Sequence, residues 1–451
     1  MADRNDWDSD PADDETPRAF NREDFQAFLK RFLENPEQFD ASELAKAAGL
    51  PSDPTELAAM ISQLQAAMAA SGQLTDGVNW KIAVDQAKAV ARKDNKPVLE
   101  AQRTALAEAE KIATLWLNAV TDVSELNTEP KLLTRDLWVD DAMPLVKALS
   151  EPIANRMSTA LSDHLRKNSP EELGADLDGA GDLMKSAGGA LFAMQLGAAI
   201  GKLSTQVISG ADLGLPIFTE QRAAFVPQNL AEFVLGLGVD QQEALIYLSV
   251  RELAHARLFR HSRWLRDHAV AQITNYASEI SIDDSKLMEL AEQQELNDPE
   301  QIRELLESGA LIAERTDDQE RALERIETML ALIEGWVEAV TTDATNLLPK
   351  QQAIGEAVRR RRATGGPTEI MFGTLVGLQL RPRLLREATE LWRKLGEELG
   401  NTVRDSLWDH PDMLPTAADI SDPSLLIARL SGDTDGDDQL DQALRDLLDD
   451  K

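Results

Sequence analysis

The chain has 451 residues, no cysteine and a formal net charge of −33. With 43% hydrophobic and 28% charged residues, it is long enough and apolar enough to bury a sizeable core. The absence of cysteine excludes disulfides, thiolate metal sites and cysteine nucleophiles, and it favours a reducing compartment. The strong negative charge argues against nucleic acid or an anionic membrane as the main partner.

The sequence predicts neither a targeting segment nor a membrane span. Residues 1–15 are acidic and lack the basic-then-apolar pattern of a secretory signal. The longest uncharged apolar run covers 186–201, which is shorter than the roughly 20 residues that a membrane-spanning helix needs. We therefore expect a cytoplasmic protein without membrane insertion.

Composition and apolar spacing divide the chain into four parts. The two ends are rich in aspartate, which predicts solvated tails without regular structure. Two apolar stripes at helical spacing, Phe25 to Leu33 and Leu57 to Met68, predict a small helical unit after the first tail. The expected parts are an acidic tail at 1–19, a helical N-terminal unit at 20–77, a main domain at 78–428 and a second acidic tail at 429–451.

The main domain is predicted to be mainly α-helical with a small β-sheet. Asn79 is expected to cap a first helix, and a longer helix follows Pro97. A small-residue helix around Gly197 and Gly201 should be buried, because glycine permits close approach of backbones. Further helices are expected at 323–337, 370–380 and 384–399, and the strand candidates are Leu213–Phe218 and Ala223–Val226.

Four consecutive arginines, Arg359 to Arg362, precede Gly365-Gly366-Pro367. They could form an anion-binding patch. They also match an ordinary helix C-terminus, where positive charges complement the helix dipole before a glycine stop. We favour the helix end.

A helix expected from Asp240 to about Arg260 carries the residues with the most chemical potential. Asp240 and Glu243 have the spacing of a capping box. In an H-E-x-x-H helix, two histidines bind one zinc ion and the glutamate activates its water. Here the sequence is Arg251-Glu252-Leu253-Ala254-His255. Arginine has no lone pair to give a metal, so the first ligand is missing.

The surroundings of this motif resemble the zincin-like metallopeptidases of actinobacteria. The resemblance covers roughly Val78 to Ser424 and implies a zincin-like fold and a metallopeptidase or hydrolase relationship. By the family's pattern, Glu334 in Glu334-Gly335-Trp336 corresponds to a third zinc ligand, while Trp336 departs from a histidine found in related branches. The matching stretches are 78–80, 114–117, 238–261, 264–266, 332–336, 359–367, 372–378, 380–383, 407–412 and 414–416.

Three interpretations follow. In the first, which we favour, the chain is a degenerate zincin and pseudoenzyme that needs no cofactor and binds an unknown protein or peptide. Arg251 would then take the metal's place and pair with Glu334, and with Glu252 as well. In the second, it is a zinc-dependent metallopeptidase or hydrolase with a rearranged site of His255, His261 and Glu334, and Glu252 is the catalytic base. In the third, it is a helical scaffold in which the motif is a core ion pair.

The second interpretation depends on His261. It follows His255 by six residues, the spacing of the third ligand in H-E-x-x-H-x-x-G-x-x-H enzymes. Those enzymes have a glycine where this chain has Leu258. A continuous helix would rotate His261 about 240° away from His255. The remaining histidines, His164, His268 and His410, are expected to be structural.

Overall fold

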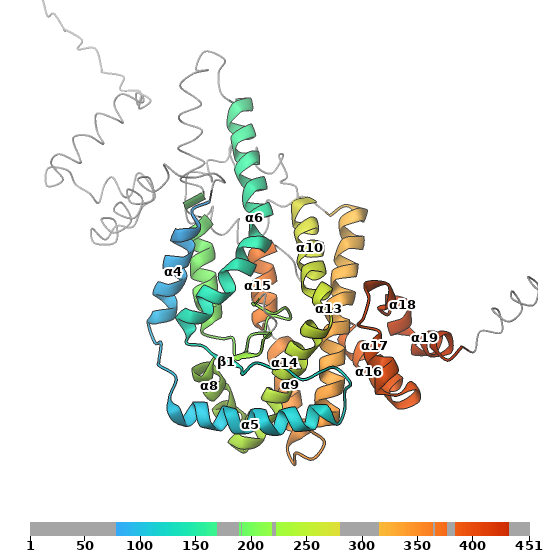
Figure 1. Cartoon of the computed structure of the whole chain (residues 1–451). Helices are drawn as coiled ribbons and strands as arrows, with labels where there is room; N and C mark the ends of the chain where they lie inside the picture. Colours follow the sequence, from blue (N-terminus) through green and yellow to red (C-terminus); the bar gives the residue numbers. More distant parts are fainter. Residues whose placement is uncertain are drawn as a thin grey trace, which may run out of the picture.

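The structure is a computed structural model that describes residues 78–168, 189–190, 192–218, 222–279, 315–363, 366–376 and 384–432 (Figure 1). The two helices expected between residues 20 and 77, all of the first acidic tail and most of the second lie outside these ranges. The division of the chain into four parts therefore stays a prediction. No helix in the described ranges is long and apolar enough to cross a membrane.

Helices make up most of the described chain, and the two strands are short. The strands are β1 (Lys131–Leu132) and β2 (Ala224–Phe225). The helices of the first half are α4 (Trp80–Arg92), α5 (Glu100–Asn118), α6 (Arg135–Asn168), α8 (Pro227–Leu237), α9 (Gln241–His261) and α10 (Arg263–Glu279). Those of the second half are α13 (Asp317–Ala344), α14 (Gln351–Ala363), α15 (Pro367–Val376), α16 (Leu385–Leu399), α17 (Asn401–Ser406), the 3-10 turn η5 (Pro411–Met413), α18 (Ala417–Ser421) and α19 (Pro423–Leu430). The expectation of a mainly helical chain with a small sheet is confirmed.

The predicted helix caps hold in the structure with one difference. The Asn79 side chain accepts hydrogen bonds from the amides of Lys81 and Ile82, and Asp240 caps α9 in the same way. The capping box predicted at Asp240 is half formed, because the Glu243 side chain does not return to the Asp240 amide. Glu243 instead accepts a hydrogen bond from the amide of Lys350, so its carboxylate joins the start of α9 to the loop before α14.

The sheet differs from the sequence prediction in one of its strands. Residues 223–226 do contain a strand, but β2 pairs in parallel with β1 rather than with residues 213–218. The 213–218 segment is buried and apolar without being a strand. Pro216 has no amide hydrogen to donate, and Gly214 turns the chain with φ of 78°. The strand at 213–218 was predicted from a run of apolar residues. A buried segment without regular structure has the same run.

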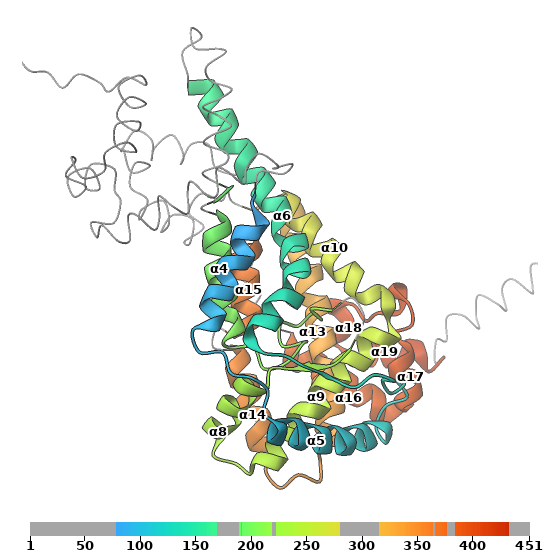
Figure 2. The ribbon, with the colours of Figure 1, turned by 60° about the vertical axis from the view of Figure 1, so that its left-hand side comes forward.

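The helix at 192–204 packs closely on α4, as its small residues predicted. Gly197 and Gly201 are both buried. A Cβ built on Gly201 would lie 2.7 Å from the carbonyl oxygen of Ala87, so only glycine fits at this distance between backbones. The pair forms one side of the described domain (Figure 2).

Helix α9 lies at the centre of the fold. It contacts α5, α8, α10, α13 and α14, and both views show α5 crossing beneath it (Figures 1 and 2). Residues 244–250 and 252–259 are all buried. A helix buried on every side places its polar side chains inside the core, where each needs a partner. The motif at 251–255 is therefore internal.

Candidate functional site

Helices α9 and α13 bring Arg251 together with two carboxylates. Arg251 Nη2 lies 2.5 Å from Oε2 of Glu334, and Nη1 lies 3.2 Å from Oε2 of Glu338. Glu334 and Glu338 are four residues apart, so they share the face of α13 that meets α9. The expected pairing of Arg251 with Glu334 is confirmed. The expected pairing with Glu252 is wrong, and Glu338 is the second partner.

Glu252 points away from Arg251 and accepts hydrogen bonds from the backbone. Oε1 accepts from the amide of Ala224 at 2.9 Å, and Oε2 accepts from the amide of Ala211 at 3.2 Å. Burial raises the pKa of Glu252 to about 7 against the opposing effect of these hydrogen bonds. Gly210 leaves the room for this contact, since a Cβ there would stand 3.1 Å from Oε1. Glu252 thereby joins β2 to the preceding loop.

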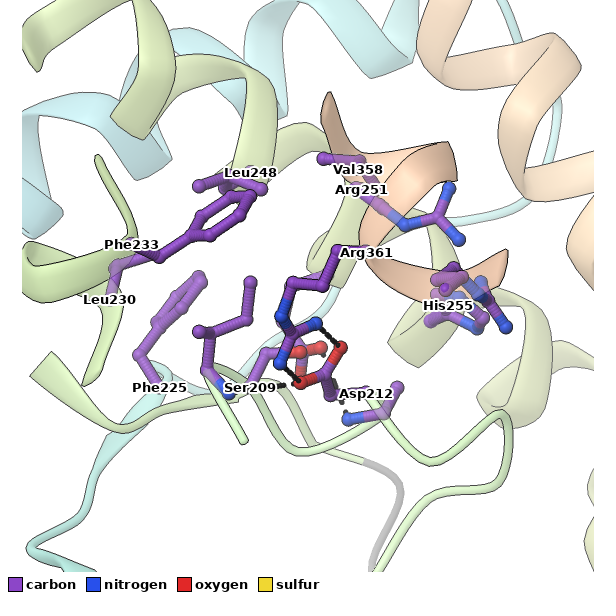
Figure 3. Close-up of a pocket in the computed structure, with 14 residues that line it drawn as sticks. Ser209, Asp212, Phe225, Leu230, Phe233, Leu248, Arg251, His255, Val358 and Arg361 are labelled. Atoms are coloured by element: carbon purple, nitrogen blue, oxygen red, sulfur yellow. Dashed lines mark hydrogen bonds and ion pairs between the residues drawn. The ribbon is translucent and has the colours of Figure 1, made fainter. Parts of the chain in front are cut away.

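The four consecutive arginines end α14, as predicted, and three of them also bind buried carboxylates, which the sequence did not predict. Arg359 Nη1 lies 2.6 Å from Glu338 Oε1, and Arg362 pairs with Glu334 Oε2. Arg361 binds both oxygens of Asp212 at 2.7 Å (Figure 3). We call Arg251, Arg359, Arg361, Arg362, Asp212, Glu334 and Glu338 the arginine–carboxylate cluster.

The cluster keeps Glu334 and Asp212 ionised inside the protein. Burial alone would raise the pKa of Glu334, but the charges of Arg362 and Arg251 hold it well below its usual range. Burial likewise opposes ionisation of Asp212, and the Arg361 guanidinium lowers its pKa. His255 is neutral near pH 7 because burial lowers its pKa. Its Nε2 lies 3.4 Å from Oε1 of Glu334.

A small cavity of about 20 Å³ adjoins the cluster (Figure 3). One wall is apolar and the other carries charged side chains. The volume has room for about one water molecule and not for a peptide side chain. The apolar wall is formed by Phe225, Leu230, Phe233 and Leu248, and the polar wall includes Ser209, Asp212, Arg251, Glu252, His255, Arg361 and Arg362.

A family model described as zincin-like metallopeptidase matches residues 78–427. The chain belongs to this family. No curated protein matches it significantly. A solved structure described as a putative hydrolase with a novel fold, from Chloroflexus aurantiacus, aligns with a TM-score of 0.54 at 18% identity. The alignment covers 80% of this chain and 100% of that chain, and at this identity it shows a shared fold.

Zinc is the metal that the family name implies, and the residues of the cluster do not fit it. His255 Nε2 and Glu334 Oε1 have the separation of two ligands on one metal, but a catalytic zinc needs three protein ligands. Arg251 and Arg362 place two positive charges on Glu334, and these would repel a cation. Within the described ranges, no group of three or more histidine, aspartate or glutamate side chains could hold a metal ion.

The structure does not bring His261 to the cluster. Helix α9 is continuous through His261, so six residues separate it from His255 by about 9 Å along the axis and about 240° around it. His261 Nε2 instead lies 2.7 Å from Oδ1 of Asp409, near the surface. A site of His255, His261 and Glu334 would need α9 to break.

Trp336, His268 and His410 lie outside the cluster and contact other parts of the fold. Trp336 faces away from Arg251, and its Nε1 donates to Oδ1 of Asp405 at 2.9 Å. His268 packs edge-on against Trp264, and His410 caps the turn at Pro411. The side chain of His164 lies outside the described part of the structure.

Asp212 and Glu338 were not predicted from the sequence, and Arg359, Arg361 and Arg362 were predicted to end a helix but not to bind carboxylates. One signal could have found Glu338. It lies with Glu334 in an otherwise apolar run from Met329 to Val340, and buried charges require partners. Asp212 carries no such signal, because it lies in a loop and its partner is 149 positions away.

Proposed function

We propose that this chain is a pseudoenzyme of the zincin-like family that binds a protein or peptide without cleaving it. The observation that supports this is the position of Arg251 and Arg362, whose guanidiniums both contact Glu334 Oε2. An arginine that neutralises a buried carboxylate does the structural work that a metal cation would otherwise do, without activating a water molecule. We retain from the sequence the actinobacterial branch and the cytoplasmic location.

The chemistry of Glu252 supports the same conclusion. A general base must reach the water that it activates, whereas both oxygens of Glu252 accept hydrogen bonds from backbone amides. Its neighbour His255 has lost the partner ligand at position 251. The motif glutamate and histidine are thus retained as parts of the core.

Metal analysis of the purified full-length chain, after dialysis against zinc and then buffer, tests the metal half of the proposal. We expect well under one zinc per chain, in the wild type and in His255→Ala alike. The control is His261→Ala, which removes a surface histidine. Stoichiometric zinc that is lost in His255→Ala and kept in His261→Ala would overturn the proposal.

The stability of Arg251→Ala tests the role of the arginine. Without Arg251, Glu338 and Glu334 each lose one of two counter-charges, so we expect a loss of about 2 kcal/mol in the free energy of unfolding by urea. The control is Arg360→Ala, whose guanidinium is 70% exposed and lies 3.8 Å from Glu356. If the two variants are equally stable, Arg251 does not replace a metal.

Retention of peptides from a mixture tests whether the chain binds peptides without cleaving them. The full-length chain is incubated with unrelated peptides, and the peptides that it retains are identified by mass spectrometry. We expect some to be retained at their full length. Recovery of shortened peptides, or retention of none, would contradict a binding role.

The alternative is a zinc-dependent metallopeptidase or hydrolase with His255, His261 and Glu334 as ligands. The 3.4 Å separation of His255 Nε2 and Glu334 Oε1 favours it, as does a carboxyl group at Glu252 with a pKa of about 7. Both features match a hydrolytic site that forms only when α9 rearranges. Loss of zinc in His261→Ala as well as in His255→Ala would identify this site.

A further inference from the structure

A groove of about 410 Å³ lies along helices α10 and α13, and none of the residues that line it belongs to the arginine–carboxylate cluster. Helices α10 and α13 lie side by side (Figure 1), and residues 414–417 before and at the start of α18 also line the groove. The volume is in the range that holds several side chains of a ligand. The residues that line it are His268, Gln272, Arg321, Glu324, Arg325, Thr328, Met329, Leu332, Leu414, Pro415, Thr416 and Ala417.

The groove combines an apolar floor with charged side chains of α13, of which Arg321 and Arg325 are positive and Glu324 is negative. Met329 and Leu332 form part of the floor, and Leu414 and Pro415 form a wall. Arg325 is exposed and makes no ion pair or hydrogen bond within the described part of the chain. An apolar groove with an unpaired guanidinium fits a segment that carries both leucines and carboxylates.

The last nineteen residues of this chain, 433–451, have that chemistry. Leu440, Leu444, Leu447 and Leu448 have the spacing i, i+4, i+7 and i+8, which places them on one face of a helix. Eight aspartates surround them, at positions 433, 435, 437, 438, 441, 446, 449 and 450. A leucine stripe in so acidic a segment has no role in solubility, so it calls for an apolar surface to contact.

The path of the chain allows this contact. Helix α18 begins at the groove wall with Thr416 as its N-cap, and α19 packs against α18. The chain leaves the described structure at Gly432, two residues after α19. Residues 433–440 can extend over about 26 Å, at roughly 3.3 Å per residue. The leucines can therefore come back to the wall from which the chain departs.

We propose that residues 440–448 bind in the α10–α13 groove of the same chain. The leucines contact Met329, Leu332, Leu414 and Pro415, and the aspartates lie beside Arg325 and Arg321. This inference does not rest on the proposed function, because it involves neither the arginine–carboxylate cluster nor zinc.

Engineered cysteines test the contact in the full-length chain, which has no cysteine of its own. Thr328→Cys places one thiol in the groove, and Ala443→Cys places the other beside the leucine stripe. Under mild oxidation we expect an intramolecular disulfide in the monomer, formed about tenfold faster than in the control pair Thr104→Cys with Ala443→Cys. Thr104 is exposed on α5, away from the groove.

A charge reversal tests the role of Arg325. Arg325→Glu in the groove pair should slow the disulfide about threefold at low salt, while Arg103→Glu on α5 should leave its rate unchanged. Thermal unfolding by circular dichroism checks that each variant is folded. Equal rates in the groove and control pairs would overturn the proposal. Disulfides mainly between chains would overturn it too, since the groove would then hold the segment of a second copy.

Discussion

Glu334 Oε2 receives guanidiniums from two directions, Arg251 on α9 and Arg362 on α14. Arg251 also contacts Glu338, which in turn binds Arg359. The charges therefore alternate in a continuous series from α14 through α13 and α9 and back to α14. Each carboxylate of the arginine–carboxylate cluster has at least one guanidinium, so desolvation of the charges is offset by short ion pairs. Removing Arg251 takes one of two counter-charges from both Glu334 and Glu338.

The raised pKa of Glu252 predicts a pH-dependent stability. The folded chain holds this proton up to about pH 7, whereas the unfolded chain releases it near the ordinary value of 4.5. Between these pH values the folded state binds more protons, so the free energy of unfolding falls as pH rises. Above pH 7 the free energy of unfolding no longer falls. The total loss is about 3 kcal/mol, because each unit of difference between the folded and unfolded pKa contributes about 1.4 kcal/mol.

Glu252→Gln lacks this ionisation and serves as the comparison. We expect the stability of the variant relative to wild type to increase as pH rises from about 4.5 to 7 and to stay constant above. Urea unfolding of both chains at several pH values measures the difference. A difference that is the same at all pH values would mean that folding does not shift the pKa of Glu252.

At the scale of elements, the domain depends on two kinds of helix contact. Helix α9 is surrounded by other helices, and its few charged side chains hold α13, the 205–218 segment and β2 around it. The helix at 192–204 instead meets α4 through glycines, which let the two backbones approach closely. The first kind of contact tolerates no change of charge, and the second tolerates no increase in volume.

Gly201→Ala tests the close contact with α4. The new methyl group would lie 2.7 Å from Ala87 O and 2.6 Å from Val90 Cβ, so the helices must separate. We expect a loss of about 2 kcal/mol in the free energy of unfolding. The control is Gly236→Ala in α8, where no atom lies within 4 Å and alanine should stabilise by about 0.5 kcal/mol. Similar changes in stability in both variants would show that the lack of space at Gly201 is not the reason for a glycine there.

At the scale of the whole molecule, a second buried carboxylate joins distant parts of the chain. Asp405 accepts hydrogen bonds from Thr121 Oγ1 at 2.7 Å, from the Asp122 amide at 2.9 Å and from Trp336 Nε1 at 2.9 Å. Its partner in charge is Arg404, at 2.8 Å. The segment after α5, the middle of α13 and α17 therefore meet at one side chain. Trp336 serves this junction.

Asp405→Ala should destabilise the domain by about 3 kcal/mol, because Arg404 is 1% exposed and would lose its buried counter-charge. We expect one cooperative urea transition at a lower midpoint. Asp409→Ala is the control, since its side chain is 55% exposed and surface substitutions change stability by about 0.5 kcal/mol or less. Two separate transitions would indicate that the junction holds two independently stable units.

The sequence by itself determined the local features of this protein. Apolar spacing and caps predicted the helices that begin at Trp80 and Gln241, because both signals come from residues within one or two turns. The close helix around Gly201 was also predictable, since glycine spacing is local. The strand at 213–218 was wrong, because an apolar run reports burial and not the pairing of its backbone.

Only the tertiary structure decided how the charges pair. The sequence singled out Arg251, Glu252, His255 and Glu334, and the family pattern related Arg251 to Glu334. The sequence did not show that Glu252 accepts hydrogen bonds from backbone amides. It also did not show that Arg359, Arg361 and Arg362 bind carboxylates of other elements. Those partners lie 21 to 149 positions apart, with Arg361 and Asp212 the most distant. Which carboxylate a guanidinium meets depends on how helices pack, and packing is a property of the whole core.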